Sequence, residues 1–176
     1  LDLAPQVRRV ALLGAPGAAF GGARPAHLMK IMALPGIGAR VLATKLTDRA
    51  FVRTNEEFAL GAGAFRDVPK DMVTAGRLIS CRPGNPESIA SYFRTLIRGN
   101  RIRSGVVVSL EELSRLPQPT MLAWGDDDIF NTPSAAAAWI VAIRDCRLVR
   151  FPNTGHAPWL QNPKAVGTAV AEHLDV

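Results

Sequence analysis

Two short segments near the carboxyl end of the chain constrain its fold more than any other feature. Trp-Gly-Asp-Asp-Asp occupies positions 124–128, and Gly-His-Ala-Pro-Trp occupies positions 155–159. Each segment follows a short apolar run, over 120–123 and 148–151, of the kind that forms a buried strand. Each is therefore expected to be the loop at the carboxyl end of a strand. Two such loops bring an acid and a histidine to one edge of a sheet, where ligands bind in open α/β folds.

A carboxylate beside an imidazole is one half of a nucleophile–histidine–acid triad. The imidazole accepts the proton of a hydroxyl nucleophile and later returns it to the leaving group, and its ordinary pKa lies close enough to neutrality for both steps. The other half of the triad has no counterpart, since the sequence contains no Gly-x-Ser-x-Gly and no such motif with Cys or Asp at its centre. The expected nucleophile is therefore missing from this sequence.

The late segments resemble a known family. Residues 119–133, the helix expected after them and residues 146–163 resemble the last third of an α/β-hydrolase, in which an acid follows a Trp-Gly strand end and a histidine lies in a Gly-His-x-Pro loop. The resemblance implies that Asp128 is the acid and His156 the general base. Ile129 stands where the family often has Pro. Because three consecutive carboxylates occupy 126–128, the choice of acid stays open by one position.

The resemblance also implies a domain organisation. Residues 7–16 are similar to the strand that follows the nucleophile elbow, so the expected fold is α/β, a partial α/β-hydrolase sheet of the last three parallel strands with an inserted helical cap. Residues 1–16 would hold a core strand, 17–116 the cap, and 117–176 the carboxyl-terminal part of the core. The middle stretch reads as several short helices broken by proline and glycine. Such folds commonly run to roughly 200–250 residues, so the chain is expected to be part of a longer domain.

Four residues are the candidate site. Asp128 and His156 are the expected catalytic pair, and Phe130 and Trp159 are the candidates for contacts with the substrate. Asp126 and Asp127 are expected to close local turns, which aspartate does readily. Gly155 is expected to let the histidine loop turn sharply.

No metal site and no cofactor are expected. The acidic run begins like a calcium-binding EF-hand loop, but Asn131 stands at the position that needs Gly, and Ala137 stands at the position that needs a bidentate Glu. His27 and His173 stand apart and form no metal-binding pair with an acid or a second histidine.

The net charge of +6 does not indicate a nucleic-acid partner. Its basic excess lies in residues 1–116, which hold 17 Lys and Arg against 9 Asp and Glu. The densest part is a set of four arginines close to two aromatic residues: Arg94, Arg98, Arg101 and Arg103, near Tyr92 and Phe93. Apolar residues at 89, 92, 93, 96 and 97 have the spacing of one helix face, so we expect the aromatic rings to be buried and the arginines to be solvated. Weak attraction to anionic membranes or acyl substrates is the alternative.

The remaining features indicate a cytoplasmic location. No apolar run reaches the length of about 18 residues that suggests a membrane-spanning helix, so no stable membrane insertion is expected. Cys81 and Cys146 form no CxxC motif and are typical of packing residues in a reducing compartment.

The expected function is esterase-like hydrolysis of small acyl or ester substrates without a cofactor. Relatives with the same late motifs cleave carbon–carbon bonds, open epoxides or remove halide, and the residue that separates several of these reactions is not in this sequence. A non-catalytic binding module derived from the same fold is the alternative from another class. We expect residues 1–176 alone to be inactive, because the pair has no nucleophile to serve. We also expect the isolated chain to self-associate or to be loosely packed, because the first strand would lack a partner on one side.

Overall fold

Three parallel strands form the centre of the molecule. A computed structural model of the chain describes residues 6–175, with β1 (Val10–Leu13), β4 (Thr120–Gly125) and β5 (Cys146–Phe151) in the order β1-β4-β5. Leu12 pairs with Leu122, and Ala123 pairs with Val149. The parallel three-stranded sheet predicted from the sequence is confirmed. The first strand is shorter than the segment 7–16 that resembles it, because only Val10 to Leu13 pair with β4.

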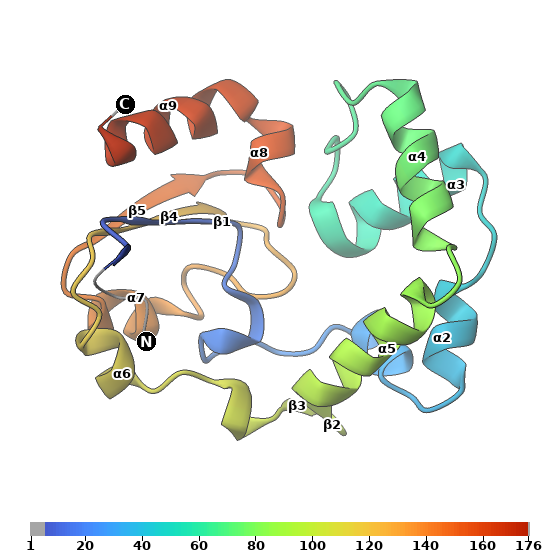
Figure 1. Cartoon of the computed structure of the whole chain (residues 1–176), viewed down its shortest axis with the longest axis horizontal. Helices are drawn as coiled ribbons and strands as arrows, with labels where there is room; N and C mark the ends of the chain where they lie inside the picture. Colours follow the sequence, from blue (N-terminus) through green and yellow to red (C-terminus); the bar gives the residue numbers. More distant parts are fainter. Residues whose placement is uncertain (1–5, 176) are drawn as a thin grey trace.

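The sheet is covered by helices on both faces (Figure 1). β4 is buried along its whole length, and its side chains alternate between the two faces, as they do in any strand. Leu122 and Trp124 pack on the side of α6 (Leu110–Ser114) and α7 (Ala137–Ala142). Met121 and Ala123 pack on the side of α9 (Pro163–Leu174). A strand buried on both faces explains why this part of the sequence is almost continuously apolar.

A group of helices lies beyond the carboxyl ends of the strands (Figure 1). It contains α1 (His27–Met32), α2 (Ile37–Leu42), α3 (Asp48–Asn55), the π-helical turn η3 (Glu56–Leu60), α4 (Lys70–Ser80) and α5 (Asn85–Leu96). A two-stranded hairpin of β2 (Ile97–Arg98) and β3 (Arg101–Ile102) follows α5. Within residues 6–175, no helix is long and apolar enough to cross a membrane.

Both ends of the helical insertion pack against the sheet. Phe20, which follows the short 3₁₀ turn η2 (Gly17–Ala19), lies in the same core cluster as Leu122 and Trp124. Leu113 of α6 lies there as well. The backbone N–H of Val108, which follows the 3₁₀ turn η4 (Ser104–Val106), donates to Ala19 O at 2.9 Å and closes the base of the insertion. The part between these ends, residues 21–107, stands away from the sheet, and we call it the cap.

Candidate functional site

Asp128 and His156 meet at the carboxyl edge of the sheet. Asp128 lies on the loop after β4, and His156 lies on the loop between β5 and α8 (Pro158–Gln161). Because β4 and β5 are adjacent and parallel, both loops leave the same edge. His156 Nδ1 lies 2.8 Å from Asp128 Oδ2. The Asp128 side chain is fully buried, whereas the His156 side chain is 27% exposed.

The Asp128 carboxylate is held by backbone donors as well as by the imidazole. The N–H of Phe130 donates to Oδ1 at 2.9 Å, and the N–H of Ala15 donates to Oδ2 at 3.1 Å. Ala15 belongs to the loop after β1, so all three strands contribute a loop that reaches the carboxylate. These bonds fix the direction in which the acid presents Oδ2 to the histidine.

The carboxylates of the two preceding residues, Asp126 and Asp127, do not lie against the imidazole. Asp126 accepts a hydrogen bond from Arg150 Nε at 2.7 Å on the surface, and this bond raises the pKa of the arginine. Asp127 is exposed, and its backbone N–H donates to Thr154 O at 3.0 Å. Of the three acids, Asp128 is the one whose carboxylate bonds to His156.

Glycines let the three loops approach one another. Gly14 has φ +81°, and a Cβ there would lie 2.5 Å from His156 O. A Cβ on Gly125 would lie 2.2 Å from the carbonyl oxygens of Thr154 and Gly155. Gly155 is not among the residues of positive φ, so its backbone conformation does not by itself require glycine. A Cβ there would instead lie 2.5 Å from Leu60 O, so close packing requires the glycine.

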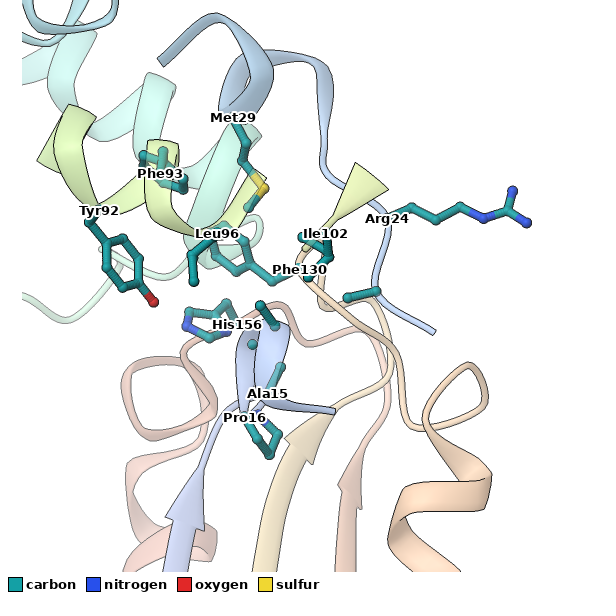
Figure 2. Close-up of a pocket in the computed structure, with 13 residues that line it drawn as sticks. Ala15, Pro16, Arg24, Met29, Tyr92, Phe93, Leu96, Ile102, Phe130 and His156 are labelled. Atoms are coloured by element: carbon teal, nitrogen blue, oxygen red, sulfur yellow. The ribbon is translucent and has the colours of Figure 1, made fainter. Parts of the chain in front are cut away.

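His156 forms part of the wall of a cavity of about 360 Å³ between the sheet edge and the cap. The wall is mostly apolar and comes from the loop after β1, α1, α5, β3 and the two late loops: Ala15, Pro16, Gly17, Ala18, Ala23, Arg24, Met29, Tyr92, Phe93, Leu96, Ile102, Phe130 and His156. Figure 2 shows the Tyr92 side chain extending toward the His156 ring, whereas the Arg24 side chain points away from the other labelled residues.

Phe130 and Trp159, the two residues predicted to contact the substrate, both pack against the His156 ring. Phe130 lines the cavity, and its ring stands edge-to-face against the imidazole with centroids 4.5 Å apart. Trp159 contacts the same ring more loosely, at 6.4 Å, and is not among the residues that line the cavity. Substrate binding by either residue stays a prediction.

Tyr92 is a cavity residue that the sequence did not reveal. Its helical spacing predicted a buried ring, but 58% of the residue is exposed and it faces the cavity. Of the five apolar residues on that helix face, Ile97 alone is fully buried. The periodicity identified the face correctly, but the face covers a cavity and not a solid core.

The cavity holds an imidazole and the phenol of Tyr92, with no serine, cysteine or carboxylate side chain in its wall. In the part of the chain that the structure describes, no three His, Cys, Asp or Glu side chains gather as metal ligands would. When Nδ1 carries the proton of its bond to Asp128, the lone pair of the other ring nitrogen, Nε2, is free to accept a hydrogen bond from a group in the cavity.

Comparisons with known proteins identify the family of the chain. A sequence model described as the alpha/beta hydrolase family matches residues 1–169. The pimeloyl-[acyl-carrier protein] methyl ester esterase of Chromobacterium violaceum is 31% identical over 134 residues, which cover 73% of this chain and 47% of that protein. The enzyme of the same name from Nitrosomonas europaea is 43% identical over 54 residues, covering 30% of this chain and 21% of that protein.

Solved structures share the fold. The 2-hydroxy-6-oxo-6-phenylhexa-2,4-dienoate hydrolase of Rhodococcus sp. strain RHA1 superposes with a TM-score of 0.71 at 18% identity, over 99% of this chain and 58% of that one. The meta-cleavage product hydrolase of Pseudomonas fluorescens IP01 gives a TM-score of 0.63 at 20% identity, over 96% and 56%. The chain thus spans less than two thirds of the length of each of these four proteins.

Proposed function

The chain belongs to the alpha/beta hydrolase family, and from this premise we propose that the whole protein carrying it hydrolyses small esters with Asp128 and His156 as acid and general base. The observation that carries the proposal is the 2.8 Å contact between His156 Nδ1 and the buried Asp128 Oδ2, with the imidazole on the wall of an apolar cavity. Relatives named as methyl ester esterases support the ester as substrate class.

In the proposed reaction His156 moves one proton twice. Asp128 accepts the Nδ1–H bond, so the lone pair of Nε2 is free to take the proton of a hydroxyl nucleophile as that oxygen attacks the ester carbonyl carbon. The imidazolium then gives this proton to the departing alkoxide, and an acyl-enzyme remains. Water, deprotonated by the same nitrogen, hydrolyses the acyl-enzyme and restores the hydroxyl. We propose that the nucleophile comes from a segment of the whole protein outside residues 1–176.

The residues that line the cavity suggest the polarity of the substrate. Met29, Phe93 and Leu96 from the cap face His156 across the cavity, so the non-reacting part of the ester is proposed to be apolar. Burying such a group releases water from apolar surface on both partners. The helical insertion would then act as a cap that supplies the outer wall, while the core supplies the acid and the base.

The test is ester hydrolysis by the whole protein. p-Nitrophenyl acetate and butyrate should be hydrolysed, and His156→Ala should lower kcat/KM by at least about 10³-fold, as loss of a triad base does. His27→Ala is the matched control, because His27 is exposed and does not line this cavity. Residues 1–176 alone should show no turnover. A His156→Ala protein that kept its rate within about tenfold would show that His156 is not the base. A whole protein that hydrolysed neither ester would leave the non-catalytic binding module as the better description.

A further inference from the structure

Gln161 connects the histidine loop to the cap. Its Oε1 accepts a hydrogen bond from the N–H of Gly155 at 2.9 Å, and its Nε2 donates to Ala62 O at 2.8 Å. Gly155 is the residue immediately before His156, and Ala62 follows η3 at the edge of the cap. Figure 1 shows α8, which carries Gln161, beside the segment that connects η3 to α4. One carboxamide therefore bonds to both the core and the cap.

The two backbones also touch directly beside this bond. A Cβ on Gly61 would lie 2.7 Å from the nitrogen of Gly155. A Cβ on Gly155 would lie 2.5 Å from Leu60 O and 2.6 Å from the Cα of Gly61. Neither position has room for a side chain, so a displacement of the cap toward Gly155 must move the backbone that leads into His156.

The cap segment that makes this contact is held on its own side. Glu56 Oε1 accepts a hydrogen bond from the N–H of Phe65 at 3.1 Å, and the N–H of Ala64 donates to Gly61 O at 3.2 Å. The Phe65 ring packs against Phe51 of α3, with centroids 5.9 Å apart. These contacts hold the loop over 61–65 against α3 and η3, so the loop moves together with these cap helices.

We propose that Gln161 is a positioning residue, which sets the orientation of the His156 imidazole together with the placement of the cap. It acts through the Gly155 backbone and touches neither the cavity nor the imidazole. The outer wall of the cavity and the base would then move as one unit, so the base is aligned only when the cap is in place. This inference rests on the role proposed for His156, but the geometry it describes can be tested without any turnover.

The experiment follows the imidazole itself in the whole protein labelled with [¹⁵N]histidine and [¹⁵N]glycine. The proton that His156 Nδ1 shares with Asp128 should give a low-field resonance, assigned by its loss in His156→Ala. Gln161→Ala should make this proton, and the Gly155 amide proton, exchange with solvent at least about tenfold faster, because both report the same local opening. Substitution of the exposed Gln6 by Ala should change neither signal. Unchanged exchange in Gln161→Ala would overturn the proposal.

One further variant separates the two hydrogen bonds of Gln161. Gln161→Glu keeps an acceptor for Gly155 but, once ionised, cannot donate to Ala62. It should leave the Gly155 amide protected and still speed exchange of the imidazole proton by about threefold or more. A wild-type imidazole signal in Gln161→Glu would show that the cap bond does not position His156, and the coupling would be refuted.

A matched pair of glycines tests the backbone contact even if Gln161→Ala fails to fold. Gly61→Ala and Gly63→Ala place the same methyl group at similar positive φ, +94° and +75°, in the same loop. At Gly61 the methyl meets Gly155, whereas at Gly63 the nearest atom is the tip of the Arg66 side chain at 3.1 Å. Gly61→Ala should disturb the imidazole resonance and Gly63→Ala should not; equal effects would contradict the proposal. Failure of the proposed function would appear differently, as an active His156→Ala protein.

Discussion

The indole N–H of Trp124 donates to the carbonyl oxygen of Asn131 at 3.0 Å, across the base of the loop that carries Asp128. Both residues are buried. Asn131 in turn donates through Nδ2 to the carbonyl oxygens of Phe20 and Gly21, at 3.3 and 3.2 Å. The acid loop is therefore tied at its far end to the strand it leaves and to the segment after β1. This network explains how a loop at the edge of the sheet can hold a carboxylate in one place.

Replacing Trp124 by Phe should destabilise the protein by about 1–3 kcal/mol, because the Asn131 carbonyl would be left buried without its donor. Some packing would be lost as well, since the smaller ring does not fill the same volume. The free energy of unfolding in urea measures the effect. Trp159→Phe is the matched control: Trp159 is 37% exposed, and the change there should stay within about 0.5 kcal/mol. If Trp124→Phe lowered the free energy of unfolding no more than Trp159→Phe does, the indole hydrogen bond would contribute nothing to stability.

The choice of acid among the three aspartates can be tested by the same conservative substitution at each. Asp128→Asn should lower kcat for ester hydrolysis by roughly 10⁴-fold, since an amide at this position favours the wrong histidine tautomer. Asp126→Asn and Asp127→Asn should stay within about tenfold, because Asp126 bonds to Arg150 and Asp127 is exposed, whereas Asp128 is the one that bonds to His156. A larger loss in Asp127→Asn would move the acid by one position.

Gly14 should tolerate no side chain. Gly14→Ala combines a strained φ of +81° with a methyl group 2.5 Å from His156 O, so it must displace the histidine loop. Gly36→Ala is the matched control, with φ +72° and no atom within 4 Å of the added carbon. The control should cost only the left-handed penalty of about 1–2 kcal/mol, and Gly14→Ala should cost clearly more. Urea unfolding compares the two, and equal losses would exclude the steric argument.

The sheet and the acid–histidine contact could be predicted because they rest on local patterns. Apolar runs at 120–123 and 148–151 indicate buried strands, and parallel pairing then brings Asp128 and His156 to one edge. The strand limits could not be predicted from hydropathy. Residues 7–16 resemble one strand, yet pairing with β4 covers only Val10 to Leu13, and pairing depends on the neighbouring strand.

The parts that sequence reasoning missed depend on contacts between distant segments. Helical spacing placed Tyr92 on the inner face of α5, but no local pattern says whether that face meets a core or a cavity. Gln161 is a surface-like residue in sequence terms, and its bond to Ala62 joins positions 99 residues apart. Gly155 looked like a turn residue, whereas the approach of Gly61 from the cap is what excludes a side chain there.

Acid should weaken the link between α3 and α4. Asp48 accepts hydrogen bonds from the hydroxyl of Thr74, at 2.7 Å, and from Arg77, and these bonds hold the pKa of Asp48 below its ordinary value of 3.8. A lowered folded-state pKa gives stability that is fully present above pH 3.8 and is lost as the pH falls through the folded-state pKa. The stability gap between wild type and Asp48→Asn should therefore be constant from about pH 7 to pH 5 and shrink below 3.8. Urea midpoints of the two proteins measure it, and a gap that did not change with pH would contradict the assignment.

The cavity predicts how the length of the acyl group affects hydrolysis. Leu96 of α5 lies on the cavity wall, so Leu96→Trp should fill part of the space that faces His156. p-Nitrophenyl hexanoate should then lose at least about tenfold more kcat/KM than the acetate, because each methylene that no longer fits an apolar pocket costs of that order. Leu78→Trp on α4 is the matched control, since Leu78 is 59% exposed and lies outside the cavity. If Leu96→Trp slowed both esters equally, the acyl chain would not enter this cavity, and its apolar wall would have to serve another part of the substrate.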